Sequence, residues 1–308
     1  MKRNNTPYLT PFMLISGIIR RIFTIRLRTG KASILLVLPA LLVTSCMPGK
    51  KTAQNFLEKR ENIAVMIVPP PASFLYYYPY EMEPEQETTS EGEIIDQSYF
   101  LSRVDVSVAD SIFLTSLQEN LAEYSVRVFS PDAYDRFLSF PGKRFIFTMA
   151  QTELVESDYP HVDRALIDTI LYRQEFLLRA VERNTWFEFI EVDDQETDGG
   201  MEVLFSTFYT SDDVSGRFRY RGFTGEMLYE YSSYIMDLQD VYSLQEFAGN
   251  GNARYIFEFL LNRHVQQNAS PIVGSPVRFR YNIRTGDISR MTEGMEFILL
   301  EASGQPEE

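Results

Sequence analysis

The chain has 308 residues, of which 44% are hydrophobic and 14% aromatic, so it can bury a substantial core. This composition excludes a wholly disordered or fibrous protein. Residues 1–45 carry seven basic residues and no acidic one, which leaves 22 basic against 43 acidic residues, a formal charge of −21, for residues 46–308. So acidic a body argues against nucleic-acid binding and against electrostatic docking on a membrane. Any membrane attachment must come from the N-terminal segment.

That segment has the features of a secretory signal peptide. Residues 32–43 form a twelve-residue run without charge, and basic residues precede it. Twelve helical residues cover about 18 Å, which is short of the ~30 Å hydrocarbon core of a bilayer. The run therefore predicts the hydrophobic region of a signal peptide rather than a spanning helix. The basic region before it is unusually long, so both Met1 and Met13 are candidate start residues.

Val43, Thr44, Ser45 and Cys46 follow this run, and Cys46 is the single cysteine of the chain. The four residues resemble the lipobox of bacterial lipoproteins, in which an aliphatic residue and two small residues precede an obligatory cysteine. The resemblance implies that a peptidase cuts after Ser45 and that Cys46 carries acyl chains, although Val43 stands where leucine is most common. No cluster of acidic residues directly follows Cys46, which favours a protein that faces the periplasm, and Met47 in place of aspartate favours the outer membrane. The alternatives are a buried core thiol or a soluble secreted protein that is cut elsewhere.

Beyond the signal peptide at 1–45, we expect a lipidated N-terminus and polar tether at 46–62, one globular domain at 63–302 and a disordered tail at 303–308. The domain is predicted to be α+β, with a mixed, mainly antiparallel β-sheet and packed helices. With Cys46 lipidated, the mature body has no free thiol and no disulfide, so its stability must come from the core alone.

The first half of the domain is predicted to alternate strands and helices. Ile63–Val68 predicts a buried strand, and the six glutamates of residues 81–93 predict a solvated loop. Apolar residues at helical spacing predict a helix from Asp105 to Tyr124, with Ser107 and Asp110 as a capping box. The further predicted elements of this half are a strand at 126–129, a short helix at 130–138 and a long strand at 144–157.

The second half is predicted to hold mostly strands. Apolar spacing favours a helix through Leu171, and residues 175–181 and 186–192 favour a hairpin around the polar residues 182–185. Residues 172–182 can also be read as helical. Paired strands are predicted at 201–209 and 216–223, followed by a helix from Met227 to Tyr242. The glycines of 249–251 are expected to separate this helix from a helical or extended segment at 253–261. A hairpin at 277–291 that turns at Thr285 and Gly286 and a last strand at 296–302 complete the predicted elements.

No residue pattern for catalysis stands out. The two histidines, His161 and His264, have no metal-ligand spacing, and the chain has no P-loop, Gly-x-Gly-x-x-Gly or Gly-x-Ser-x-Gly motif. Asp194–Gly200 imitates the first half of a calcium-binding EF-hand loop, but Phe205 stands where the bidentate glutamate belongs. We therefore expect no catalytic residue, no metal and no cofactor, and we expect Trp186 to lie in the core.

Tyr76, Tyr77, Tyr78 and Tyr80 are candidates for a partner-binding surface, because tyrosine gives contact area at low entropic cost. The alternative is that they only cover a sheet edge. The favoured hypothesis is a lipid-anchored, non-enzymatic periplasmic module that binds or assembles an envelope protein or a cell-wall component. The second hypothesis is a lipid-anchored hydrolase of envelope glycan or peptide, for which two carboxylates about 5–10 Å apart in a cleft with aromatic walls would be the signature.

Overall fold

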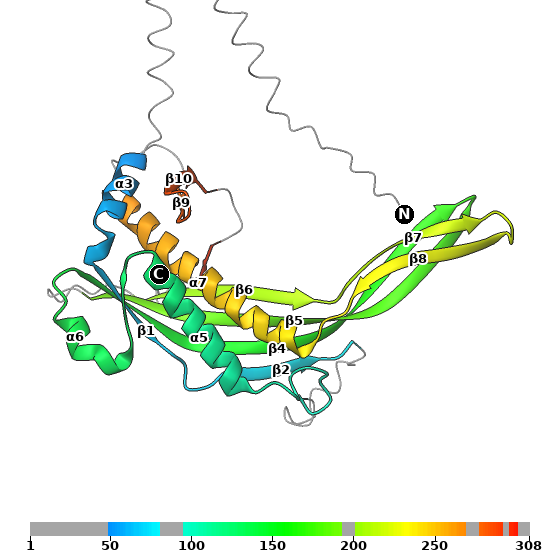
Figure 1. Ribbon diagram of the computed structural model, residues 1–308, viewed down its shortest axis with the longest axis horizontal. Helices are drawn as coiled ribbons and strands as arrows, with labels where there is room; N and C mark the ends of the chain where they lie inside the picture. The colour runs from blue at the N-terminus through cyan, green and yellow to red at the C-terminus, as the bar shows by residue number, and fades with distance from the viewer. Residues whose placement is uncertain (1–48, 81–94, 193–200, 269–276, 292–295, 301–308) are drawn as a thin grey trace, which may run out of the picture. The chain divides into compact units, whose positions relative to one another are not determined.

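A mixed β-sheet organises the part of the chain that the structure describes. The computed structural model describes residues 49–80, 95–192, 201–268, 277–291 and 296–300. All of them belong to the compact unit Pro48–Glu308, which has helices beside a mixed, mostly antiparallel sheet (Figure 1). The predicted α+β class is confirmed. The signal peptide, Cys46 and the predicted acidic loop lie outside the described residues.

The main sheet has seven strands among the described residues, in the order β11-β6-β5-β4-β1-β3, with β2 also beside β4. The strands are β1 (Ile63–Val68), β2 (Phe74–Tyr78), β3 (Arg127–Phe129), β4 (Lys143–Ile167), β5 (Ile170–Val192), β6 (Glu202–Ser211) and β11 (Ile298–Leu300). β1 runs parallel to both of its neighbours and β2 runs parallel to β4, whereas β4, β5, β6 and β11 pair antiparallel. The predicted strands at β1, β3 and β11 are confirmed, and β4 runs well beyond its predicted end.

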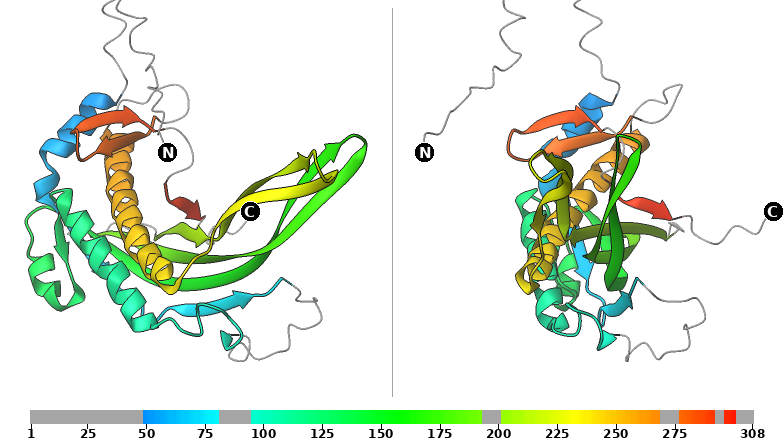
Figure 2. Two further views of the ribbon diagram at one scale, coloured as in Figure 1. Left: turned by 45° about the vertical axis from the view of Figure 1, so that its right-hand side comes forward. Right: turned by 90° about the vertical axis from the view of Figure 1, so that its right-hand side faces the viewer.

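Two long helices, α5 (Val106–Glu123) and α7 (Leu238–Asn268), pack against each other over one face of this sheet (Figures 1 and 2). Phe113 of α5 and Phe257 of α7 are fully buried in the core that results. The prediction of α5 is confirmed, but its cap differs. The side chain of Asp105 accepts hydrogen bonds from the backbone N–H groups of Ser107 and Val108, so Asp105 is the N-cap in place of the predicted box.

The helix α7 passes through Gly249 and Gly251 without a break, so the predicted separation at these glycines is wrong. A Cβ atom on Gly249 would lie 2.6 Å from the carbonyl oxygen of Phe113 in α5, and one on Gly251 would lie 2.3 Å from the ring of Phe208. The glycines therefore allow close packing against α5 and β6. This packing outweighs the low helix propensity of glycine, about 1 kcal/mol per residue.

The predicted tether holds ordered structure. Helix α3 (Lys50–Glu58) and the 3-10 turn η2 (Arg60–Asn62) occupy most of residues 46–62. Ala53 and Phe56 of α3 are buried, and the ring centroid of Phe56 lies 5.7 Å from that of Phe257. The packed body therefore begins at α3 instead of Ile63, because two apolar residues one turn apart are enough to dock this otherwise polar helix.

The opposite face of the sheet is covered only in part by described elements. The 3-10 turn η4 (Pro131–Ala133) and helix α6 (Tyr134–Leu138) match the predicted short helix, and Phe137 of α6 packs against Ala64 and Met66 of β1.

Trp186 of β5 lies on this opposite face of the sheet, half-buried, with its ring 4.8 Å from that of Phe205. The prediction of a core position for Trp186 is wrong, because alternate residues of a strand face opposite sides and its neighbours take the helix-covered side.

β4 and β5 continue past β2 and β6 as a two-stranded extension, residues 158–179, which we call the arm (Figure 1). A second hairpin, β7 (Asp213–Arg221) and β8 (Glu226–Tyr234), packs along the arm. The ring of Phe176 lies 5.8 Å from that of Tyr229 and 5.1 Å from that of Tyr231, and the Tyr229 hydroxyl donates a hydrogen bond to Asp163. These contacts fasten the two hairpins together.

The arm overturns the predicted helix through Leu171 and the predicted turn at 182–185. Leu166 faces Leu171 across the hairpin, and Asp168 and Thr169 make the turn with φ of 49° and 68°. The apolar residues that flank a two-residue turn imitate helical spacing, which explains the error. Residues 182–185 instead continue β5 without a turn, so the open question for residues 172–182 resolves as strand.

The hairpin β7–β8 overturns two more predictions. β6 and β7 were expected to pair, but β6 pairs with β5 and β11, and β7 pairs with β8. The range from Met227 is strand β8 up to Tyr234, and helix begins only at Leu238. By contrast, the hairpin of β9 (Phe279–Asn282) and β10 (Asp287–Arg290) is confirmed, with Gly286 at φ 72° in its turn.

Candidate functional site

The predicted tyrosines lie on an edge strand. β2 pairs with β4 alone among the described strands, and it carries Tyr76, Tyr77 and Tyr78, with Tyr80 just beyond its end. Tyr78 and Tyr80 are 55% and 50% exposed, and Phe74 at the start of the strand is 54% exposed. The structure thus brings the predicted tyrosines to a sheet edge that no further described strand covers, with large aromatic groups exposed, which suits contact with a partner.

A cluster of aromatic and arginine side chains extends this edge to the base of the arm. The Tyr77 hydroxyl donates a 2.8 Å hydrogen bond to Asp158, and burial together with this carboxylate raises the pKa of Tyr77 to about 12. Asp158 also lies 3.5 Å from the guanidinium of Arg179. The ring of Tyr99 has Arg179 at 4.4 Å and Arg103 at 4.1 Å from its centroid. We call β2 with Tyr80, Tyr99, Arg103 and Arg179 the tyrosine edge.

A buried carboxylate fixes Tyr99 in this position. Glu156 of β4 is fully buried, and its two oxygens accept hydrogen bonds from the backbone N–H groups of Tyr99, Phe100 and Leu101 at 2.8–3.0 Å. Three donors converge on one charge, which makes these bonds strong. The loop before α5 therefore has a defined path, and Tyr99 is presented with its exposed ring beside β2.

A second buried network holds the start of β2. Arg183 of β5 is 1% exposed, and it donates to Asp110 of α5 and Gln245 of α7, both at 2.9 Å. The Ser73 hydroxyl donates 2.6 Å to the same Asp110 oxygen and lies 2.7 Å from Thr152. The network therefore ties the sheet, both long helices and the residue before β2 into one unit, and this gives the tyrosine edge a rigid base.

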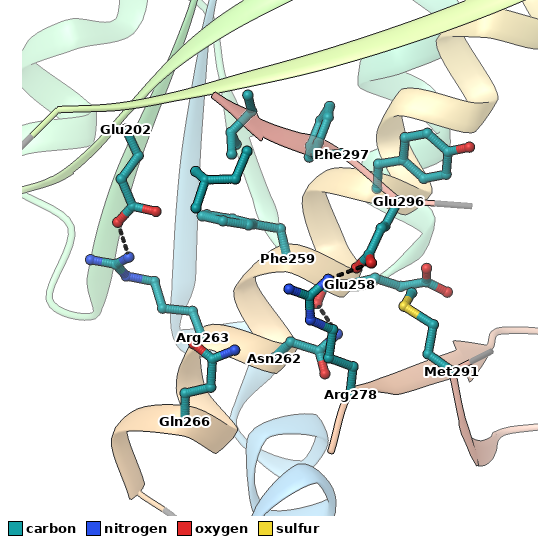
Figure 3. Close-up of a pocket in the computed structure, with 13 residues that line it drawn as sticks. Glu202, Glu258, Phe259, Asn262, Arg263, Gln266, Arg278, Met291, Glu296 and Phe297 are labelled. Atoms are coloured by element: carbon teal, nitrogen blue, oxygen red, sulfur yellow. Dashed lines mark hydrogen bonds and ion pairs between the residues drawn. The ribbon is translucent and has the colours of Figure 1, made fainter. Parts of the chain in front are cut away.

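A pocket of about 160 Å³ lies between α7, β6 and the β9–β10 hairpin (Figure 3), and its lining bears on the hydrolase hypothesis. It holds Glu202, Glu258 and Glu296, and Tyr255, Phe259 and Phe297 supply aromatic walls. Burial raises the pKa of Glu258 to about 7 against the opposing effects of Arg280 and Arg254. This pocket thus has carboxylates and aromatic walls, which are part of the signature that the hypothesis requires.

Arginines pair with all three carboxylates. Glu202 bonds to Arg263 and Glu296 to Arg278, as Figure 3 shows, and Oε1 of Glu258 lies 3.3 Å from Nε of Arg280. Glu258 is also only 2% exposed. A carboxylate that must give or take a proton in hydrolysis has to reach the substrate. The ion pairs and the burial of Glu258 make this pocket a weaker candidate site than the tyrosine edge.

The histidines have separate surroundings. His161 lies in the arm, 3.4 Å from Asp163, and His264 of α7 lies with its ring 5.4 Å from that of Phe56. Burial lowers the pKa of His264, with help from the nearby Lys143 and Lys59. In the part of the chain that the structure describes, no group of three or more His, Cys, Asp or Glu side chains could hold a metal. The predicted EF-hand-like stretch Asp194–Gly200 lies outside that part.

Sequence reasoning found the tyrosines but missed Tyr99, Arg103 and Arg179. The position of Tyr99 depends on the hydrogen bonds that Glu156 accepts from the loop that holds Tyr99, which lies 55–57 residues away along the chain. Such a long-range contact leaves no pattern in the local sequence. The predicted lipidation residue Cys46 and the predicted signal-peptidase recognition residues Val43, Thr44 and Ser45 are not among the described residues and stay predictions.

No protein-family model and no curated protein matches the chain. Within the described residues, the helices are all too short or too polar to cross a membrane.

Proposed function

We propose that the chain is a lipid-anchored protein of the bacterial outer membrane, that it faces the periplasm, and that it works as a non-enzymatic binding or assembly module. Its partner is another envelope protein or a cell-wall component. The lipobox-like sequence that ends at Cys46 supports the anchor. The arm and the tyrosine edge support the binding role.

The observation that carries the binding role is the exposure of apolar side chains at the end of the arm. Leu166 and Leu171 are 73% and 64% exposed, and Phe223, in the turn between β7 and β8, is fully exposed. Both hairpins end at this tip (Figures 1 and 2). Large apolar groups gathered at the end of a projecting element mark an interaction site, because leaving them in water has a cost that contact with a partner removes.

Site-specific photo-crosslinking in living cells tests this role. We expect a crosslinker that replaces Leu171 at the tip or Tyr78 at the tyrosine edge to give a discrete adduct with an envelope component. A crosslinker that replaces Tyr209 is the matched control, because this side chain is 68% exposed on β6 and belongs to neither surface. Adducts from Tyr209 alone, or from none of the three positions, would refute the binding role.

Labelling with a fatty-acid probe tests the anchor. We expect the wild-type protein to incorporate the probe and fractionate with the outer membrane, and Cys46→Ala to lose both properties. Equal labelling of the two proteins would remove the lipoprotein proposal and leave the binding surfaces unaffected.

A hydrolase is the second candidate, and the pKa of about 7 for Glu258 in a pocket with Glu296 is the observation that favours it. The test is turnover of purified cell-wall glycan by the wild-type protein and by Glu258→Gln. Turnover that Glu258→Gln abolishes would make this the primary function. Equal lack of turnover by both proteins would leave the binding module.

A further inference from the structure

A cavity of about 550 Å³ lies beside the C-terminal end of α3, where the turn before β4 and the end of β5 meet α7. Its lining includes Lys59, Lys143, Arg144 and His264. Glu191 is the one carboxylate among the described residues that line it, and Glu191 already lies 3.2 Å from Lys143 and 3.4 Å from Arg263. The cavity therefore has an excess of positive charge in a chain whose net charge is −14.

The walls of this cavity are preformed. A Cβ atom on Gly142 would lie 2.0 Å from the carbonyl oxygen of Asn62, so the turn at Pro141–Gly142 is pressed against the end of η2. Phe56 fixes α3 by its ring contacts with Phe257 and His264 on α7. A cavity of this size lies in the ordinary range for small-molecule sites, roughly 300–1,000 Å³. A ligand group would meet the cationic side chains without a rearrangement of the backbone.

The cavity is also at the end of the body that carries the proposed anchor. Three residues separate Cys46 from Lys50 at the start of α3, and the four residue-to-residue steps between the two span at most about 14 Å. The nine residues of α3 add about 14 Å between Lys50 and the cavity. A lipid on Cys46 therefore keeps the cavity within reach of the headgroups of the membrane in which it is inserted.

The surroundings of the cavity share its charge. From Lys50 to Asn62 and in the β9–β10 hairpin with its flanking residues, the basic residues are Lys50, Lys51, Lys59, Arg60, Arg278, Arg280, Arg284 and Arg290, and the acidic residues are Glu58, Glu61 and Asp287. Arg278 and Arg280 pair with Glu296 and Glu258, which leaves six basic residues against these three acidic ones. The net charge of the chain conceals this concentration of positive charge. Near an anionic membrane surface each exposed lysine or arginine contributes about 1 kcal/mol of attraction, so this end of an acidic protein can face anionic lipid.

We propose that this cavity binds the phosphate group of an anionic phospholipid headgroup, with Lys59 and Lys143 as its principal ligands, and that it docks the anchored end of the body on the membrane. The inference rests on the proposed function for the presence of a membrane beside the cavity. Lys59 and Lys143 would pair with the phosphate oxygens, and the buried Arg144 would add a fixed positive charge.

The test uses residues 48–308, the compact unit without the anchor, and vesicles of phosphatidylcholine with or without an equal part of phosphatidylglycerol. We expect binding to the phosphatidylglycerol vesicles alone, and binding that weakens as salt is added. Lys59→Ala/Lys143→Ala should weaken binding at least about tenfold. Lys50→Ala/Lys51→Ala, a charge-matched change on α3 outside the cavity, should weaken it less, and Arg217→Ala/Arg219→Ala on β7 should leave it unchanged.

Two results would overturn the proposal: no binding by the wild-type unit, or equal losses in all three double variants, which would show diffuse attraction instead of a site. Thermal unfolding of each variant checks that it folds. If Lys59→Ala/Lys143→Ala does not fold, the wild-type unit supplies the test. Glycerol phosphate should raise its melting temperature and displace it from vesicles. A higher melting temperature without vesicle binding would assign the cavity to a soluble phosphate compound and reject the lipid.

The result of the vesicle-binding test can be told apart from the result of the test of the lipid anchor. The cavity variants retain Cys46, so fatty-acid labelling of the full chain is expected to stay at the wild-type level. A failure of labelling therefore rejects the anchor, whereas a failure of vesicle binding rejects the headgroup site.

Discussion

The strands β4 and β5 pass through two different environments. In the half under α5 and α7, their side chains Phe147, Leu154, Val181 and Phe187 are fully buried. In the arm, the same two strands keep the same antiparallel pairing, but every one of residues 164–173 is half-buried or exposed. Backbone pairing thus gives both halves their shape, whereas side-chain burial stabilises mainly the covered half. We therefore expect the half of the two strands under α5 and α7, which belongs to the body of the protein, to be more stable than the arm that projects from it.

The largest effect should come from the covered half. Phe147→Ala removes a fully buried ring from the contact between β4 and α7, where Phe259 lies 6.2 Å away. We expect it to lower the free energy of unfolding by about 3–5 kcal/mol, because the loss of the apolar side chain adds to the cost of the cavity. Urea unfolding followed by circular dichroism measures this change. A loss below 1 kcal/mol would contradict the assignment of this region as the main core.

Glu156→Gln should come next, with a loss of about 3 kcal/mol, because it replaces a buried carboxylate that accepts three backbone hydrogen bonds with a neutral amide. The exposed Glu175 of the arm is the control, and Glu175→Gln should change stability by less than about 0.5 kcal/mol. Urea unfolding compares both variants with the wild-type protein. Equal small effects would show that the loop around Tyr99 is not held by this charge.

Glu258 should make stability depend on pH. Its pKa in the folded chain, about 7, exceeds the ordinary value of 4.5, so the folded protein keeps a proton that the unfolded chain releases. The stabilisation is complete below pH 4.5 and is lost as the pH rises through 7. The difference corresponds to about 3 kcal/mol. We expect Glu258→Gln to remove this decline, as measured by urea unfolding at a series of pH values. Parallel pH profiles for the two proteins would contradict the raised pKa.

Gly249→Ala tests the contact between the two covering helices. The new methyl group would meet the backbone of α5, where overpacking typically costs about 1–3 kcal/mol. The better helix propensity of alanine returns up to about 1 kcal/mol, so we expect a net loss of about 1–2 kcal/mol in thermal unfolding. Gly222→Ala in the turn of β7–β8 meets no atom within 4 Å and should be neutral. A gain in stability for Gly249→Ala would show that the helices are less close.

Several elements of the body could be predicted from the sequence, whereas the arm could not. Ile63–Val68, the helix from Asp105 and the hairpin at Thr285–Gly286 were predictable, because their apolar spacing, capping residues and turn residues are local. The arm was not, because the residues beside its turn imitate helical spacing and the β7–β8 hairpin that packs along it comes from a later part of the chain. The unbroken α7 was missed for a related reason, since only the contact with α5 explains Gly249.

Part of the candidate site could likewise be predicted from the sequence, and part of it could not. The tyrosines of β2 were visible as a run of aromatic residues, and the structure places them on an open edge. The arginine partner Arg179 of Tyr99 and the cationic cavity were hidden, because each combines residues that lie far apart in the chain. The acidic net charge of the chain gave no indication of the basic residues that line this cavity.

The smallest effect should come from the arm. Phe176→Ala removes the ring that contacts Tyr229 and Tyr231 of β8, but this ring is only half-buried. We expect the global free energy of unfolding to fall by about 1 kcal/mol, the ordinary worth of such aromatic pairs. Local opening should increase more, because these contacts fasten β7–β8 to the arm. Hydrogen exchange is therefore the decisive measurement: amides of residues 213–234 should exchange faster in Phe176→Ala, while those of β1 and α5 stay at the wild-type rate. Uniform acceleration across the chain would show that arm and body unfold together, and the two halves of β4 and β5 would then share one stability.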